Sequence, residues 1–193
     1  MAAPTSVSLS RLDGKYVLNK TLSDSVVSLL ALQGISWPIR KAASIATPKI
    51  SIKSETWDDG VICIEITSAV SGMPGGGSTE KCQLDWSEWE KKDPIIGNYK
   101  GKMGLHSFAE LPENDFLRGR VVKDGGEGLG WSDGEDAKYI GIVLQSSKGR
   151  WTGEHIWGFE IINQERRYTR RMLIKKGEKV ELARLVYDYI GIA

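Results

Sequence analysis

The sequence has few of the residues that build metal and redox centres. Its 193 residues include two cysteines and two histidines, and no HExxH zinc motif occurs. Cys63 and Cys82 fit no metal-binding spacing. They could lie on neighbouring strands, but a reduced pair, as in intracellular proteins, is favoured. We therefore predict no metal and no cofactor.

Signals for nucleotides, membranes and nucleic acids are also missing. The chain has no GxxxxGK[ST] phosphate loop, and residues 126–131 carry a tryptophan where a dinucleotide-binding motif has its third glycine. No run approaches the ~20 apolar residues of a membrane helix, and the first residues lack the apolar core of a signal peptide. The net charge of +1 creates no field that attracts nucleic acid. A cytoplasmic protein with no nucleic-acid partner and no membrane span is expected.

The composition is that of an ordinary globular protein. Apolar residues make up 40% of the chain and charged residues 26%. Seven tryptophans are many for this length, and most are expected in the core or on a cavity wall. The length suits one domain with a sizeable core, over residues 1–193.

The first quarter of the chain predicts one strand and two helices. After a polar leader, residues 14–19 are typical of a strand. Apolar residues then recur at helical spacing, with Thr21 or Ser23 as the N-cap. A second helix follows with Ser36 as its N-cap and should end near Thr47, which is held extended by the proline after it.

The rest of the chain consists of short runs that are typical of strands. These predicted strands are 49–54, 61–69, 79–86, 98–109, 139–146, 151–163, 165–175 and 179–190. Tight turns at residues 163–164 and 176–177 join the last three into a meander. A long series of strands with almost no helix between them favours a closed antiparallel barrel, which has no free sheet edge, over a β-sandwich.

Two glycine-rich segments interrupt the strand pattern. Residues 71–78 are flexible by composition, because glycine has no Cβ. Residues 112–136 form a long, charged loop that is either a lid or binding loop, or a loose surface insertion. We expect both segments and the two helices to flank the entrance of a cavity.

The segments GKYVL (14–18), LALQGI (30–35) and ATPKISI (46–52) surround the predicted helices. Together they resemble the opening of intracellular fatty-acid-binding proteins, which are calycins. The resemblance implies an all-β, closed antiparallel barrel with a two-helix cap after the first strand. The segment with Arg184 and Tyr187 is similar to the family's closing strand, whose Arg-x-Tyr pair holds a ligand carboxylate. An extra residue separates the two here, so a regular strand would turn them to opposite faces unless a bulge intervenes.

The strand at residues 151–163 is the most informative candidate site. Period two places His155, Trp157 and Phe159 on its apolar face, which is the interior of a barrel. Because histidine titrates near neutral pH, His155 could be a general base or a ligand donor. A core histidine with one hydrogen bond is the other interpretation. If the chain is an enzyme, Tyr168 on the next strand is the second catalytic candidate.

Arginines extend the candidate site. They occupy both faces of residues 165–175, so at least one guanidinium could point inward and would need Glu154, Glu160 or a ligand oxygen as partner. A solvated basic face is the alternative. The predicted ligand-binding residues are Trp157, Phe159, His106, Trp131, Arg166, Arg184 and Tyr187.

These observations support two main hypotheses. The first is a protein that binds a small hydrophobic molecule, such as a lipid, terpenoid or polyketide, inside the barrel. The second is a cofactor-free cyclase, isomerase or dehydratase that uses the same cavity, because preorganised shape and a few donors can suffice. Residues 157–160 and 166–168 also resemble small fungal lipocalin-like proteins, some of them encoded beside natural-product pathways. A nucleic-acid or protein interaction barrel is the weaker third reading.

Overall fold

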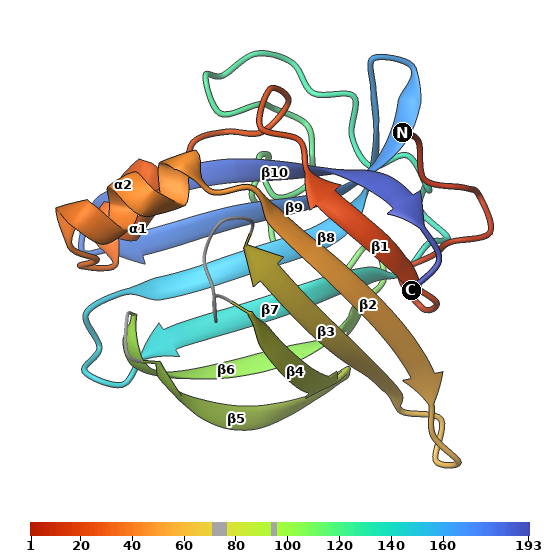
Figure 1. Cartoon of the computed structure of the whole chain (residues 1–193), viewed down its shortest axis with the longest axis horizontal. Helices are drawn as coiled ribbons and strands as arrows, with labels where there is room; N and C mark the ends of the chain where they lie inside the picture. Colours follow the sequence, from red (N-terminus) through yellow and green to blue (C-terminus); the bar gives the residue numbers. More distant parts are fainter. Residues whose placement is uncertain (71–76, 94–95) are drawn as a thin grey trace.

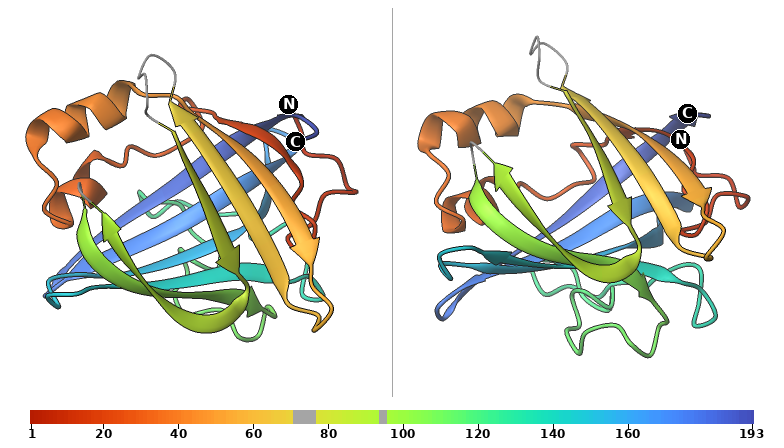
Figure 2. Two further views of the ribbon diagram at one scale, coloured as in Figure 1. Left: turned by 60° about the horizontal axis from the view of Figure 1, so that its bottom comes forward. Right: turned by 90° about the horizontal axis from the view of Figure 1, so that it is seen from below.

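The computed structural model describes residues 1–70, 77–93 and 96–193. In these parts of the chain, ten strands form one antiparallel sheet that curls into a nearly closed barrel, and two helices follow the first strand (Figures 1 and 2). The predicted fold class is therefore confirmed. The elements are β1 (Gly14–Leu18), α1 (Val27–Leu32), α2 (Trp37–Ile45), β2 (Pro48–Thr56), β3 (Ile62–Val70), β4 (Ser78–Gln83), β5 (Asp85–Asp93), β6 (Gly97–His106), β7 (Tyr139–Ser146), β8 (Thr152–Ile162), β9 (Glu165–Lys176) and β10 (Lys179–Gly191).

The strand order explains both the closure and the one opening of the barrel. The order is β4-β3-β2-β1-β10-β9-β8-β7-β6-β5, so β1 joins the first strands to the last one. β4 and β5 are the two ends of the sheet and follow each other in sequence through Leu84. Among the described residues no ladder joins β4 to β5. We call the space between these two strands the seam.

Side chains that point inward from the strands form the central core of the barrel. This core includes Tyr16, Ile50, Ile52, Ile64, Met103, Ile140, Ile142, Trp157, Phe159, Tyr168 and Tyr187. The chain before β1 adds Ala3, Val7, Leu9 and Leu12, all of them buried. The interpretation of this segment as a polar leader is therefore wrong. Its apolar residues follow no regular period, so the pattern did not reveal that they are buried.

The helices cap one end of the barrel. Leu29 of α1 packs with Trp151, Met172 and Ile174. Helix α1 begins later than predicted, after Val26, and has no side-chain cap. The predicted cap Ser23 instead accepts a hydrogen bond from the backbone N–H of Val186 on β10, at 2.9 Å. The α2 prediction is confirmed in position, with Ser36 at the N-cap, although the Ser36 side chain makes no capping bond.

Residues 107–138 cover the outer face of the sheet rather than the cavity entrance. Leu111, Phe116, Leu117 and Trp131 pack there with Tyr139 and Ile156, and partly buried Leu173 and Leu182 join them. The segment 112–136 is therefore neither an entrance loop nor a loose insertion, and we call residues 107–138 the outer cover. The other predicted entrance loop, residues 71–78, lies largely outside the described residues.

Strand β5 was missed in the sequence. The predicted strand at 79–86 is in fact two elements, because the chain turns at Leu84 and continues as β5. Trp86 has a left-handed φ of 63°, and the pairing of β5 with β6 shifts register between Asp85 and Glu88. Six of the nine β5 residues are charged, which masked the strand pattern.

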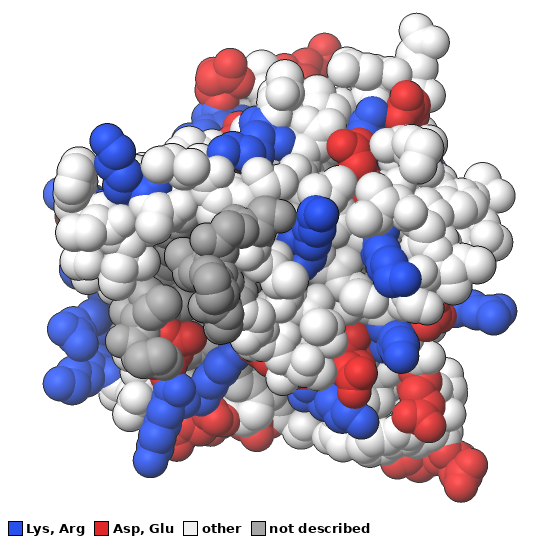
Figure 3. All heavy atoms as spheres, in the orientation of Figure 1, with Lys and Arg blue, Asp and Glu red and all other residues white. Residues whose placement is uncertain are grey.

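The surface carries both signs of charge. Lys and Arg are interspersed with Asp and Glu over the face seen in Figure 3. Within the described residues, neither helix has the length and apolarity needed to cross a bilayer.

Candidate functional site

Two arginines of strand β9, Arg166 and Arg170, share the inward alternation with Tyr168. Arg166 packs on the Phe159 ring at the end of the barrel, and Arg170 lies further along the strand, among the interior side chains. The neighbours of Arg170 in the alternation, Tyr168 and Met172, pack in the interior clusters. The Arg170 Nε donates to the Tyr168 hydroxyl at 2.9 Å, and the guanidinium lies 3.8 Å from the centre of the Trp157 ring. The Arg170 Nη2 is buried and has no hydrogen-bond partner among the described residues. The interior therefore contains a cation with unused hydrogen-bonding capacity.

Two further polar atoms beside Arg170 lack partners. His155 Nε2 and Trp157 Nε1 are both buried and unpaired among the described residues. Burial, together with the Arg170 guanidinium, lowers the pKa of His155 to about 4. The imidazole is consequently neutral at pH 7, and either ring nitrogen can carry its proton. Near neutral pH the positive charge at this point of the interior belongs to Arg170.

An apolar cavity of about 300 Å³ lies beneath α1, and His155 is the member of this group that lines it. Its lining includes Leu29, Tyr99, Leu144, Trp151, His155 and Met172. This combination of apolar walls with a few unpaired polar groups at one point is typical of a small-molecule site.

Tyr168 is the centre of the aromatic cluster behind Arg170. Its ring contacts Tyr16, Trp157, Phe159 and Tyr187, with centroid distances between 5.1 and 6.2 Å. Burial raises the pKa of the Tyr168 hydroxyl, which therefore stays protonated. The Tyr168 hydroxyl accepts the Arg170 Nε–H, and its catalytic role stays a prediction.

Five of the nine predicted site residues face the interior. They are His155, Trp157, Phe159, Tyr168 and Tyr187. Their contact with a ligand stays a prediction. Because side chains alternate between the two faces of a regular strand, the sequence was enough to assign these residues to the inner face.

His106 and Trp131 lie outside the barrel, so their prediction as cavity residues is corrected. His106 stacks on Trp86 at 4.5 Å, over Gly141 on the outer face. Its neighbour Leu105 takes the inward position. Trp131 belongs to the outer cover, where its ring lies against Gly158 and its Nε1 donates to the Leu117 carbonyl at 3.2 Å.

Arg184 and Arg166 do not reach the cavity either. The β9–β10 pairing runs from residue 179 to residue 187 without a bulge, so Arg184 points outward and Tyr187 inward. Arg184 Nη1 donates to the outer-face carboxylate of Glu160 at 3.3 Å. Arg166 lies at the end closed by the N-terminal segment, and its guanidinium bonds both oxygens of Asp133.

Arg170 was missed as a site residue. The sequence analysis expected an inward arginine on residues 165–175 but did not decide which one. The signal was present, because Arg170 shares its alternation with Tyr168, Met172 and Ile174, whereas Arg171 shares its face with polar Arg167 and Thr169. An apolar set of neighbours marks the inner face.

The cysteines and acidic residues form no metal site among the described residues. Cys63 and Cys82 are on neighbouring strands but are both free thiols. In the register of β3 and β4, Cys63 lies opposite Gln83 and Cys82 opposite Ile64, so the two side chains are on opposite faces.

Comparison with known proteins finds relatives in sequence and solved structures of the same fold. The chain is 28% identical over 193 residues to "Pericyclase pydY" of an Acremonium species, covering 99% of this chain and 98% of the relative. It is 27% identical over 192 residues to "Probable pericyclase scpY" of Mollisia scopiformis, covering 98% and 95%. No model of a known protein family matches.

Solved structures of fatty-acid-binding proteins share the architecture. One from Schistosoma mansoni, in complex with arachidonic acid, superposes with a TM-score of 0.51 at 13% identity and covers 95% of this chain and 99% of its own. One from Drosophila melanogaster brain gives 0.51 at 12% identity, covering 90% and 96%. The chain has the calycin fold.

This calycin barrel departs from the pattern expected for its last strand. The Arg-x-Tyr pair that the resemblance implied would place an arginine of β10 inside. Here Tyr187 remains inside, and the inward guanidinium comes from Arg170 on β9, 5.3 Å from the Tyr187 ring centre. The interior cation of this calycin thus sits on a different strand.

Proposed function

We propose that this chain is a cofactor-free enzyme that binds a small hydrophobic molecule inside the barrel and promotes a pericyclic reaction of it. The proposal depends above all on the Arg170 guanidinium, which is packed against Trp157 with Nη2 unpaired among the described residues. His155, whose pKa the Arg170 charge helps to lower, connects it to the lining of an apolar cavity. The names of both full-length relatives, which call them pericyclases, support the choice of reaction.

The chemistry of a pericyclic reaction suits these residues. Its bonds form and break in one cyclic transition state, so it consumes no oxidant, reductant or external proton. Catalysis then requires that the reacting atoms be held close and that a conjugated carbonyl be polarised. Arg170 Nη2 and Trp157 Nε1 can donate to such an oxygen, and these bonds strengthen as the oxygen gains negative charge. With its pKa lowered to about 4, His155 is a weak base and is not needed for proton transfer.

The binding step is tested with Arg170→Met and Arg184→Met. The probe is 1-anilinonaphthalene-8-sulfonate (ANS), an apolar fluorophore with one anionic group, measured by fluorescence titration. Arg170→Met should weaken binding about tenfold or more, because a charge-assisted bond is lost. Arg184→Met should not, since Arg184 points outward. Arg170→Met should not lower the free energy of unfolding, because it removes a buried cation that has a single hydrogen bond among the described residues, to Tyr168. Equal affinity in wild type and Arg170→Met would contradict the proposed anchor.

The catalytic step is tested in the host organism by deleting the gene and comparing its metabolites. An intramolecular pericyclic reaction leaves the mass unchanged, so the deletion strain should accumulate an isomer with the same mass and a different retention time. Wild-type protein should restore the normal compound, and Arg170→Met should not. An unchanged metabolite profile, with a compound still bound to the purified protein, would identify a carrier instead.

A further inference from the structure

The seam between β4 and β5 contains a cavity of about 520 Å³. The two strands diverge from their junction at Leu84 (Figure 2), and they are the ends of the sheet. Both inward-facing residues and outward-facing ones, such as Lys81 and Gln83, line this cavity, which therefore reaches from the outer surface of the seam to its inner side. Glu80 lies opposite Ile66 and Cys82 opposite Ile64, and both isoleucines pack in the central core. The seam cavity therefore opens toward the interior.

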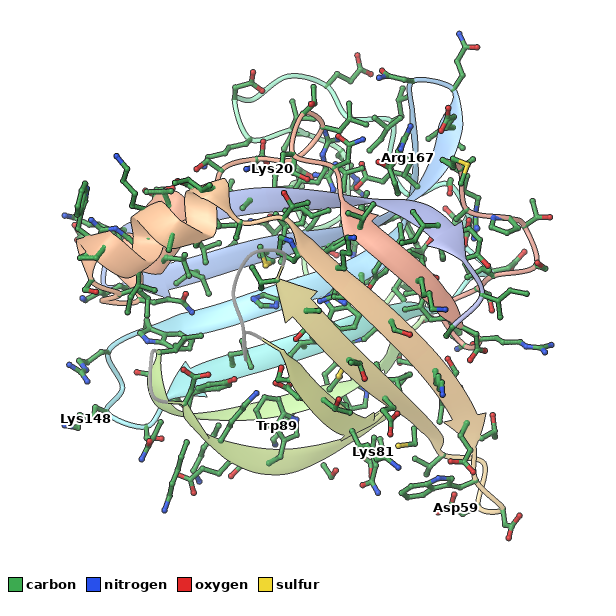
Figure 4. The ribbon with its side chains drawn as sticks, in the orientation of Figure 1. Lys20, Asp59, Lys81, Trp89, Lys148 and Arg167 are labelled. Carbon is green, nitrogen blue, oxygen red and sulfur yellow. The ribbon has the colours of Figure 1, made fainter. Side chains whose placement is uncertain are left out.

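On the β5 side, the seam cavity is lined by Trp89, whose indole N–H makes no hydrogen bond to a described residue. Trp89 lies opposite Gly101, where an added Cβ would come within 2.3 Å of the indole. The missing side chain at Gly101 thus lets the ring lie against β6. Trp89 Nε1 is buried and has no partner among the described residues. In the view of Figure 4, Trp89 lies between the β4 and β5 ribbons.

The inner end of the seam cavity approaches Arg170. Burial raises the pKa of the Cys82 thiol, and Glu80, Lys91 and Arg170 are among the charges that act on it. Cys82 lines the cavity and packs against the central core, which contains Trp157 and Tyr168. These two residues contact the Arg170 guanidinium. A molecule in the seam is therefore close to the proposed anchor.

Among the described residues, one ion pair bridges the seam. Lys91 on β5 bonds Glu80 on β4, and their side chains are 34% and 43% exposed. An ion pair with this exposure adds little to stability and is readily displaced. We propose that the ligand enters through the seam, displacing the Glu80–Lys91 pair and contacting Trp89 on its way to Arg170. This inference rests on the proposed function, since it assumes that Arg170 is the anchor.

Described residues make several closing contacts at both ends of the barrel. At the helical end, Leu29 is buried in an apolar cluster, and the Asp24 carboxylate accepts the Arg184 backbone N–H at 2.7 Å. At the other end, the Arg166 guanidinium bonds the carbonyls of Pro4 and Val7, each at 3.0 Å. Entry at either end must expose apolar core or break several of these bonds, whereas the seam requires the loss of one exposed ion pair.

The entrance is tested by stopped-flow association and dissociation of ANS. Lys91→Glu places two carboxylates across the seam and should raise both rate constants by the same factor, about threefold to fivefold. The dissociation constant should stay the same, because only the barrier changes. The reversed pair Glu80→Lys/Lys91→Glu should restore wild-type rates. Glu80→Gln breaks the pair without repulsion and should raise the rates as well, which keeps the test valid if Lys91→Glu does not fold.

The matched control is Lys100→Glu, which makes the same change of net charge. Lys100 pairs with Glu88 at 2.9 Å and faces away from the barrel interior, so its replacement should not change the rates. If Lys91→Glu and Glu80→Gln leave the rates unchanged while Arg170→Met still weakens ANS, the entrance is elsewhere and the proposed anchor stands. If Leu29→Ala raises the rates and the seam variants do not, entry is under the helices. If Arg170→Met binds ANS as wild type does, the anchor itself is wrong.

Discussion

Arg170 and Arg171 are sequence neighbours with opposite surroundings. Arg171 is fully buried on the outer face, where its Nε and Nη2 bond the two oxygens of Glu160 at 2.8 and 2.9 Å. Its Nη1 also bonds the carbonyls of Phe116 and Val121 in the outer cover. In the described parts of the chain, Arg170 has one hydrogen bond, to Tyr168. The Arg171 guanidinium is thus fully used by the fold, whereas Arg170 Nη2 has no hydrogen-bond partner among the described residues.

His155 gives the protein a pH-dependent stability. Because the pKa of His155 falls from its ordinary 6.5 to about 4 on folding, the unfolded chain binds a proton between these pH values that the folded chain does not. Stability from this residue is therefore complete above pH ~6.5 and is lost as the pH falls toward 4. The contribution is about 3 kcal/mol. Urea unfolding of wild type and His155→Gln should show the difference between their free energies changing by this amount across the window.

His106→Gln is the control for this pH series. Burial lowers the pKa of His106 as well, but less, and His106 lies on the outer face. The His106→Gln variant should therefore keep most of the wild-type dependence of the free energy of unfolding on pH. A His155→Gln variant with the same slope as wild type would show that the imidazole is not buried in the neutral form. A loss of conversion in His155→Gln, with binding retained, would instead assign His155 the general-base role considered from the sequence.

The outer cover is held in place where the Trp131 ring packs on β8 at Gly158, a position that has no side chain. A Cβ at Gly158 of β8 would lie 2.4 Å from the Trp131 ring. Gly158→Ala should therefore displace Trp131, destabilise the fold by about 1–3 kcal/mol, and speed tryptic cleavage at Arg118, Arg120 and Lys123. ANS affinity should be unchanged, because the cover is outside the barrel.

Gly153→Ala on the same strand is the comparison for this experiment. Its Cβ would meet Ile174 Cδ1 at 2.7 Å, inside the barrel, and tryptic cleavage of the outer cover should stay as in wild type. Equal cleavage of Gly158→Ala and wild type would mean that Trp131 does not anchor the cover.

The elements differ in how far the sequence predicted them. Strands β7 to β10 have clear apolar alternation and tight turns, and their positions were predicted to within a few residues. The left-handed φ values of Asn163 and Gln164 fit the turn expected there. Strand β5 and the outer cover were missed because tertiary packing decides them: β5 is mostly charged, and the cover is apolar only at scattered positions. For the same reason, the outward positions of His106 and Trp131 could not be inferred without strand boundaries.

Across the whole molecule, protection of backbone amides from hydrogen exchange should decrease from β8 and β9 toward the seam. β8 and β9 are paired on both sides, covered inside by the aromatic cluster and outside by the outer cover. β4 and β5 each have one free edge and little covering. Hydrogen exchange measured by mass spectrometry should therefore be slowest in β8 and β9 and fastest in β4 and β5. Equally slow exchange in β4 and β9 would show that the seam does not open.

Side chains of β8 and β9 point alternately outward and inward, and the two sets have different roles. The outward set, with Glu160 and Arg171, ties the barrel to its outer cover. The inward set, with His155, Trp157 and Arg170, lines the interior. Most mutations destabilise a fold. If the outward-facing contacts supply much of the stability, the inward-facing residues can be replaced with less risk to folding. A lineage of such barrels can therefore acquire new substrates by exchanging every second residue of two strands, while its exterior stays under separate selection.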